Sequence, residues 1–262
     1  MLTLTNAFLI SIGINLAMFI PAYRYKTDKL TDISYAVTFV TLAIYGYFSS
    51  AHTNSHKLAY YMVLAWAFRL GYFLFSRVKR VGKDRRFDGM RSSFWLFLRF
   101  WVLQGLTAFV VMLAALMLWQ QNLTLLNPTS WLGLMVFVLG LVLEATADAQ
   151  KAAFSQKNKS KKWIDVGVWR SSRHPNYLGE MMIWLGMYFF AYSSLKGASA
   201  ALGLISPDFI IVLLCFASGI PILEKSSDKK WGEDKDYQRY KQEVPLLVPS
   251  PQSILRTMLY HR

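Results

Sequence analysis

The sequence predicts an all-α integral membrane protein, a bundle of about seven transmembrane helices forming a single domain over residues 1–262. The chain of 262 residues is 54% hydrophobic, yet it carries a net charge of +14. Seven apolar stretches each approach the roughly 20 residues that cross a bilayer core. The basic residues are concentrated in alternate connections between these stretches. Soluble basic proteins and nucleic-acid-binding proteins do not combine these features.

The connections between the apolar stretches are too short to hold a second domain. The first stretch has no basic segment in front of it and no small-residue cleavage pattern before Pro21, so we expect it to be retained as a span. Pro21 and Pro221 lie at the ends of expected spans, and the two halves of the chain show no internal symmetry of the transporter kind. The expected spans, in chain order, are 4–22, 33–51, 58–76, 94–118, 131–149, 178–195 and 207–223.

The lysines and arginines predict the orientation of the bundle. Spans 1, 3, 5 and 7 are followed by 25 of the 29 Lys and Arg residues, whereas the opposite connections hold only Lys57 and Lys196. The positive-inside rule then places the N-terminus outside and the C-terminus in the cytoplasm. The net charge is explained by topology, so nucleic acid is not an expected partner. The single cysteine, Cys215, excludes an intramolecular disulfide, and no metal-ligand spacing is present.

Ionisable side chains inside a membrane span are costly and mark functional sites. Glu144 and Asp148 are four residues apart, so they share one face of span 5. Because buried polar groups need partners or water, we expect a hydrated cavity open to the cytoplasm. Internal salt bridges, for instance between Arg69 and Asp148, are the alternative. The polar residues inside the spans are Arg69, Arg99, Glu144, Asp148 and Glu180, with Gln104 as a neutral companion.

The stretch GVWRSSRHPNYLGEMMIWLG, residues 167–186, places polar groups directly before an apolar run. Pro175 disfavours helical geometry at the preceding residue, and Asn176 is a good N-cap for span 6. A helix N-terminus behind a basic loop favours an anion. Arg170, Arg173 and His174 add positive or switchable charge, and arginine suits bidentate phosphate recognition. This chemistry predicts a phosphorylated, aromatic cytosolic cofactor flanked by Trp169 and Tyr177; contact with anionic lipid is the alternative for the two arginines.

At these residues a family resemblance becomes specific. The segment GVWRSSRHPNYLGE resembles the signature shared by steroid 5α-reductases, sterol reductases and isoprenylcysteine carboxyl methyltransferases. Two further stretches, FRLGYFLFSRVKRVGKDRRFDGMR (68–91) and EATADAQKAAF (144–154), resemble the bacterial DUF1295 proteins of the 5α-reductase-like group. The segment EKSSDKKWGEDKDYQRYKQEVPLLVP (224–249) is similar to the closing part of the superfamily.

The resemblance implies a seven-span fold in a bacterial inner (cytoplasmic) membrane. NADPH would bind in the C-terminal half, residues 131–250, and a lipophilic substrate would enter a cavity made by spans 1 to 4. The oligomeric state stays open. Tyr237 is a weaker candidate on the cofactor side. Arg173 and His174 are cofactor-binding candidates through the chemistry of the basic stretch. The further cofactor-binding residues that the resemblance implies are Arg69, Arg80, Glu144, Asp148, Asn176, Tyr177, Glu180, and Glu224 or Lys225.

The sequence departs from the steroid reductases at the substrate site. One turn before Arg69 those enzymes carry a tyrosine, and here the position is Trp66, which cannot act as a proton donor. The steroid reductases also hold the substrate with a glutamate on span 2, and the candidates for this catalytic group here are Asp32, at the expected membrane edge, and Tyr45, expected to lie deeper.

The expected reaction is reduction of a carbon–carbon double bond conjugated to a carbonyl in a steroid- or lipid-like molecule. Hydride is delivered to the β carbon, a polar group stabilises the enolate oxygen, and a proton arrives at the α carbon. Two alternatives stay open: an S-adenosylmethionine-dependent methyltransferase, and a non-enzymatic membrane protein. The aromatic residues do not select among them, because Trp119, Trp131, Trp163 and Trp169 near span ends fit an interfacial belt.

Overall fold

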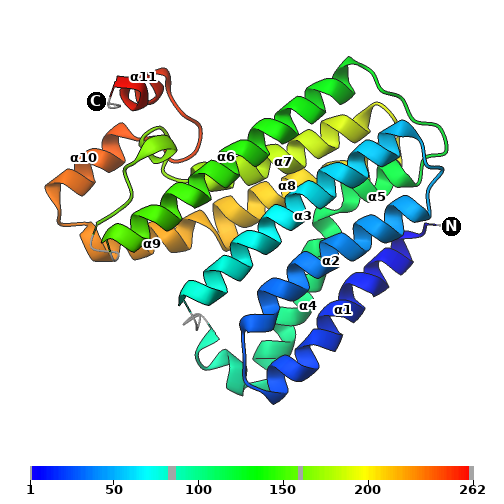
Figure 1. Cartoon of the computed structure of the whole chain (residues 1–262), viewed down its shortest axis with the longest axis horizontal. Helices are drawn as coiled ribbons and strands as arrows, with labels where there is room; N and C mark the ends of the chain where they lie inside the picture. Colours follow the sequence, from blue (N-terminus) through cyan, green and yellow to red (C-terminus); the bar gives the residue numbers. More distant parts are fainter. Residues whose placement is uncertain (1, 82–86, 159–161, 260–262) are drawn as a thin grey trace. The chain divides into compact units, whose positions relative to one another are not determined.

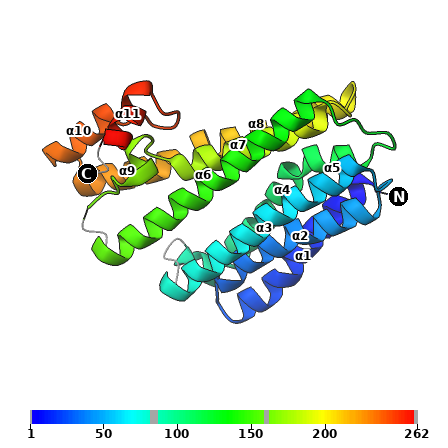
Figure 2. The same cartoon turned by 45° about the horizontal axis from the view of Figure 1, so that its top comes forward.

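The computed structural model describes residues 2–81, 87–158 and 162–259, with the side chains at 77–81, 256 and 258 left outside the description. These residues form helices and connecting turns, and none of them belongs to a strand. Figure 1 shows the order of the helices along the chain, and Figure 2 shows the same helices after a rotation. The all-α prediction is therefore confirmed.

Each expected span corresponds to a helix or to consecutive helices. Five segments of the described residues are long and apolar enough to cross a membrane, as in a multi-pass membrane protein. Two other helices, α2 and α7, have 20 and 18 residues but carry polar side chains in their first turns, which makes them less apolar. The five segments are α1 (Leu4–Arg24), Asn54–Ser76 within α3 (Asn54–Val81), α4 (Phe94–Val111), Pro128–Lys157 within α6 (Pro128–Asn158), and Ala198–Trp231.

Two expected spans are interrupted. The stretch 94–118 divides at Met112 into α4 and α5 (Leu113–Trp119). The last span begins at Ala198, earlier than expected, and consists of α8 (Ala198–Val212), a π-helical turn (Leu213–Ala217) and α9 (Ile220–Trp231). Pro207 lies inside α8, whereas Pro221 stands at the start of α9, a position where the missing N–H costs nothing.

The chain divides into two compact units. The first comprises residues 1–134 and 187–206, and the second comprises residues 135–186 and 207–262. The expected cofactor-binding half, 131–250, overlaps mainly with the second unit.

In the first unit, α1 packs against α2 (Lys29–Phe48) and α4, and α2 packs against α3. A buried polar network joins three of these helices. The Gln104 side-chain amide donates to Asn15 Oδ1 at 2.9 Å and lies 2.8 Å from Ser34 Oγ. Asn15 in turn donates to Thr38 Oγ1 at 3.1 Å. Such interhelical hydrogen bonds hold helices together where the surroundings are apolar.

In the second unit, α6 and α7 (Pro175–Tyr192) approach each other at two glycines. A Cβ atom on Gly179 would lie 2.8 Å from both the Gly140 carbonyl oxygen and the Glu144 backbone nitrogen. Only glycine allows this backbone contact, which is the small-residue packing typical of membrane helices. The closing segment of the unit consists of α9, α10 (Lys235–Glu243) and α11 (Pro251–Leu259).

Candidate functional site

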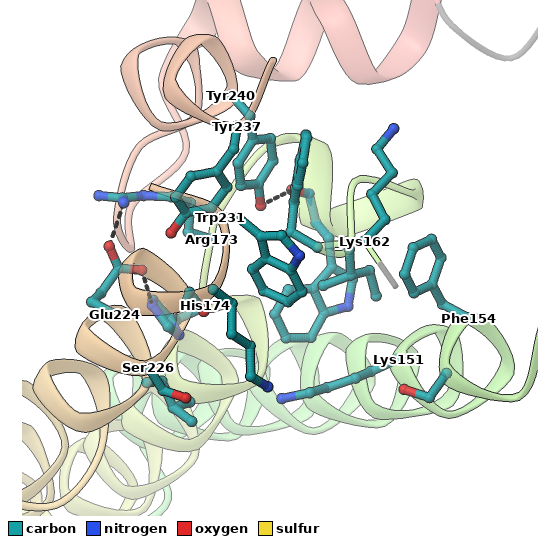
Figure 3. A pocket seen from close by; sticks show the side chains of 17 residues that line it. Lys151, Phe154, Lys162, Arg173, His174, Glu224, Ser226, Trp231, Tyr237 and Tyr240 are labelled. Atoms are coloured by element: carbon teal, nitrogen blue, oxygen red, sulfur yellow. Dashed lines mark hydrogen bonds and ion pairs between the residues drawn. The ribbon is translucent and has the colours of Figure 1, made fainter. Parts of the chain in front are cut away.

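A cavity of about 240 Å³ opens in the second unit. Figure 3 shows that Glu224, Arg173 and His174 lie on one side of it and Phe154 on another. The lining comes from four segments of the chain: the C-terminal part of α6, the connection before α7, α9 and α10. Its cationic side chains are Lys151, Lys162, Arg173 and Lys230, its one carboxylate is that of Glu224, and its large aromatic side chains are Phe154, Trp163, Trp169, Trp231, Tyr237 and Tyr240.

Lysines and tryptophans are paired around this cavity. The Nζ atom of Lys151 lies 5.2 Å from the centre of the Trp169 ring. The corresponding distances are 5.0 Å from Lys162 to Trp163 and 5.5 Å from Lys230 to Trp231. Each of these rings therefore has an ammonium group over one of its faces. A ligand that combines aromatic rings with negative charge matches this lining.

Glu224 forms the centre of an ion cluster at the edge of the cavity. Arg173 Nη1 donates to Glu224 Oε2 at 2.5 Å, and His174 Nε2 lies 2.9 Å from Glu224 Oε1. Lys241 on α10 lies 3.4 Å from the same carboxylate and 2.7 Å from Asp228 Oδ1. Through these contacts Glu224 links the start of α7 to α9 and α10 at the cavity wall.

Backbone contacts fix the connection that carries Arg173. Gly167 has φ +54°, in the left-handed region that favours glycine, and begins a 3-10 turn, Gly167–Arg170. Trp169 Nε1 then donates to the Ala147 carbonyl on α6 at 3.0 Å. The backbone N–H of Arg173 donates to the Pro245 carbonyl at 2.9 Å. The arginine is thus held between α6 and the segment after α10.

Two tyrosines of α10 complete the wall. Tyr240 donates to the Trp169 carbonyl at 3.1 Å, and Tyr237 donates to Asp228 Oδ1 at 2.9 Å. Burial raises the pKa of Tyr240, and burial together with the hydrogen bond to Asp228 raises the pKa of Tyr237. Both phenols therefore remain neutral hydrogen-bond donors at physiological pH.

Several predicted cofactor residues lie on α6 and α7. Asp148 and Glu144 are 6% and 4% exposed, and the Asn176 side-chain amide lies 3.5 Å from Asp148 Oδ1. Glu180 is half-buried one turn further along α7. The ring of Tyr177 stacks on that of His174 with 5.7 Å between centres.

The prediction that Asn176 caps this helix is wrong, because α7 begins at Pro175. Proline is favoured at the first helical position, where its absent N–H removes no hydrogen bond. The N–H groups of Tyr177 and Leu178 both donate to the His174 carbonyl at 3.1 Å. These two N–H groups are therefore already bonded to the backbone.

Other predicted residues are not among those that line this cavity. Lys225 is exposed on α9 and does not line it. Arg69 is half-buried on α3 in the first unit, 5.6 Å from the centre of the Phe73 ring. Arg80 belongs to the same helix, and its side chain lies outside the described residues.

The two candidate catalytic residues stand at opposite ends of α2. Asp32 is three residues from its first residue, and Tyr45 is three residues from its last, with a phenol oxygen 3.3 Å from the Thr3 backbone nitrogen. At 1.5 Å per residue they are about 20 Å apart. Because of this separation, the two side chains cannot act together on one reacting carbonyl.

Sequence reasoning missed most of the aromatic wall. Trp163 was expected at a lipid interface, but it is 7% exposed and lines the cavity. Trp169, which was expected either beside the cofactor or in the interfacial belt, is 3% exposed and also lines the cavity. Trp119 is also buried and donates to the His56 carbonyl at 3.1 Å. Of the four expected belt residues, Trp131 alone is exposed, at 53%. The alternation of lysine, tryptophan and tyrosine in the closing segment was the available signal.

Comparison with known proteins gives one match. The model of the family described as "Protein of unknown function (DUF1295)" matches residues 18–244. No curated protein and no solved structure matches the chain. Among the described residues no group of three or more His, Cys, Asp or Glu side chains is arranged to hold a metal ion.

Proposed function

The chain belongs to the DUF1295 family, and from this premise we propose that it is a membrane-embedded, NADPH-dependent reductase. Its substrate is a lipophilic, steroid- or lipid-like molecule with a carbon–carbon double bond conjugated to a carbonyl. The reductase is related to the steroid 5α-reductases by the resemblance of its sequence.

The observation that carries this proposal is the composition of the cavity in the second unit. Four cationic side chains face one carboxylate there, and three tryptophans accompany three of the cations. NADPH is a polyanion that carries an aromatic adenine and a dihydronicotinamide ring, so its charge and its rings both suit the lining. S-Adenosylmethionine carries a sulfonium cation and no phosphate, so a cationic cavity disfavours it. The charge of the lining therefore supports the reductase over the methyltransferase.

The chemistry of each side chain indicates which part of the cofactor it suits. Lys151, Lys162 and Lys230 suit phosphate groups as mobile point charges, and Arg173 suits them as a fixed donor. The tryptophan faces suit adenine. Asp148 and Asn176, one to two turns away along α6 and α7, suit the polar ribose and amide groups. Bound NADPH supplies the hydride, and the chain's part is to hold it and to exclude water.

We further propose seven spans, with the N-terminus outside and the C-terminus in the cytoplasm of a bacterial inner membrane. The alternation of basic connections supports this orientation, which places the closing segment in the cytosol where NADPH is available. The substrate then enters from the bilayer into a cavity of spans 1 to 4. Because Asp32 and Tyr45 are far apart, one of them at most polarises the substrate carbonyl.

Thermal stability of the purified protein in lipid nanodiscs tests the cofactor assignment. A ligand at one hundred times its Kd stabilises the folded protein by about 2.7 kcal/mol. NADPH is therefore expected to raise the apparent Tm by several degrees, and S-adenosylmethionine is not. Stabilisation by S-adenosylmethionine alone would replace the reductase by the methyltransferase. Stabilisation by neither would leave a non-enzymatic membrane protein.

A second measurement tests the location of the site. Trp163, Trp169 and Trp231 line the cavity, so bound NADPH should quench tryptophan emission by energy transfer. Replacing these three residues by phenylalanine should remove most of that quenching. Quenching that persists would place the nucleotide elsewhere. Oxidation of NADPH in the presence of a lipid-soluble enone then reports turnover.

A further inference from the structure

The helix α11 packs against the rest of the second unit through its polar face. Ser253 is 1% exposed, and its hydroxyl donates to the Ser171 carbonyl at 3.0 Å. Thr257 is four residues later, hence on the same face, and is half-buried. Leu255 and Leu259 lie on the opposite face and are 58% and 75% exposed. A helix docked on a soluble protein normally buries its apolar face, so α11 has the reverse orientation.

Exposed apolar side chains also occur in the segment before this helix. Val248 is 70% exposed and Leu246 is 38% exposed. We name these two residues and Ile254, Leu255 and Leu259 the α11 patch. Side chains of this kind remain outward when the surrounding medium is itself apolar.

The depth of α11 follows from its neighbours. Ser171, its hydrogen-bond partner, directly follows the turn Gly167–Arg170, and that turn is tied to Ala147 on α6. Ala147 is 19 residues beyond Pro128, where α6 begins. At 1.5 Å per residue this is about 28 Å, close to the roughly 30 Å thickness of the hydrocarbon core. A span that enters the bilayer at the start of α6 therefore leaves it at the level of α11.

The charge of this end of the chain suits an anionic surface. Residues 249–262 contain Arg256 and Arg262 and no acidic residue. Amphipathic helices with this composition lie in the interface, with apolar side chains among the acyl chains and basic ones near the headgroups.

We propose that α11 is an interfacial membrane anchor, whose patch inserts into the cytoplasmic leaflet and holds the closing segment at the bilayer surface. The occupant of the patch is lipid, with phosphatidylglycerol as the favoured class. The anchor is independent of the ligand that the cavity binds.

Single-cysteine labelling of the full chain tests the anchor. Cys215 is the one natural cysteine, so Cys215→Ser gives a background without thiols. A fluorophore is then attached at Leu255→Cys or at Leu259→Cys, with Glu233→Cys, which is exposed before α10, as the matched control. The proteins are reconstituted in phosphatidylglycerol-containing nanodiscs, with or without lipids that carry a nitroxide on the acyl chain.

The expected result is several-fold stronger quenching by nitroxide lipid at the two α11 positions than at the control, with several-fold weaker quenching by iodide. Equal exposure of all three labels to iodide would show that the patch faces water and would overturn the anchor. Protection from both quenchers would show that a protein, for instance a second copy of the chain, covers the patch, which also overturns it.

Discussion

Arg173, which directly precedes the HPNY segment (residues 174–177), forms an ion pair with Glu224 on α9, and the distance between Arg173 Nη1 and Glu224 Oε2 is 2.5 Å. Their side chains are 14% and 20% exposed, so the pair is largely shielded from water. Because His174 and Lys241 contact the same carboxylate, one side chain holds three segments together. Glu224 was predicted to contact the cofactor. Its contacts suit a positioning residue that supports the cavity.

Replacement of Glu224 by alanine should therefore destabilise the protein. The change leaves Arg173 without its carboxylate partner, which costs about 1–3 kcal/mol for a charged hydrogen bond at a partly buried site. We expect the apparent Tm in nanodiscs to fall by several degrees, and NADPH affinity to fall with it. Glu233→Ala, at an exposed position, is the control. An unchanged Tm in Glu224→Ala would show that the ion cluster has no structural role.

The lysines of the cavity should determine the affinity for NADPH. Replacing Lys151 or Lys230 by glutamine removes a cation from the lining but keeps most of the side-chain volume. We expect each change to weaken NADPH binding by roughly tenfold, or about 1.4 kcal/mol, and to reduce the salt dependence of binding. Lys225→Gln is the matched control, since this lysine is exposed on α9 and does not line the cavity. Equal losses of NADPH affinity in Lys225→Gln and Lys230→Gln would indicate that the lysines act through the overall positive charge of the surface and not through the cavity.

The carboxylate of Asp148 on α6 and the side-chain amide of Asn176 on α7 give a separate prediction. Asp148→Ala and Asn176→Ala should each weaken NADPH binding by about tenfold through loss of polar contacts. Insertion should be unaffected, because neither residue lies in the most apolar part of its helix. Membrane fractionation measures insertion, and nucleotide titration measures affinity. Unchanged affinity in both variants would exclude this pair from the cofactor site.

The membrane helices could be predicted from the sequence because an apolar run of sufficient length has few other structures available to it. The helix ends were harder, since α3 and α6 continue through polar residues to Val81 and Asn158 once they leave the apolar region. The segment HPNY, residues 174–177, also stood out through its chemistry, whereas Glu224 was a candidate only through the family resemblance.

The aromatic wall could not be predicted in the same way. Trp163, Trp231 and Tyr240 are far apart along the chain and meet only because the closing segment folds back on the connection before α7. A tryptophan near the end of a span has the same local sequence whether it faces lipid or a cavity. The difference depends on tertiary contacts, as at Trp169, whose indole reaches the Ala147 carbonyl.

Tyr240 should make the protein sensitive to alkaline pH. Burial raises its pKa in the folded state, so between the usual tyrosine pKa of about 10 and that higher value the unfolded chain has lost a proton that the folded chain keeps. Stability contributed by the neutral phenol is present below pH of about 10 and is lost as the pH rises. Tyr240→Phe cannot ionise, so its Tm should fall less on going from about pH 8 to about pH 10.5.

Near neutral pH, Tyr240→Phe should instead lower the free energy of unfolding by about 1 kcal/mol, because the hydrogen bond to the Trp169 carbonyl is lost. The Tm difference between the two proteins should therefore shrink or change sign as the pH rises. Tyr25→Phe, at a 76% exposed position, is the control. A pH-independent difference would show that ionisation of Tyr240 is not linked to folding.

The close contact of α6 and α7 at Gly140 and Gly179 gives the last prediction. Gly179→Ala would bring a methyl group to 2.8 Å from the Gly140 carbonyl oxygen, so the helices must separate. Overpacking of this kind costs about 1–3 kcal/mol. Gly13→Ala on α1 has nothing within 4 Å and should instead stabilise the helix by about 0.5–1 kcal/mol. Because α7 carries Asn176 at its start, separation should also weaken NADPH binding in Gly179→Ala and leave it unchanged in Gly13→Ala. Comparable Tm values and affinities in the two variants would contradict a tight contact that supports the site.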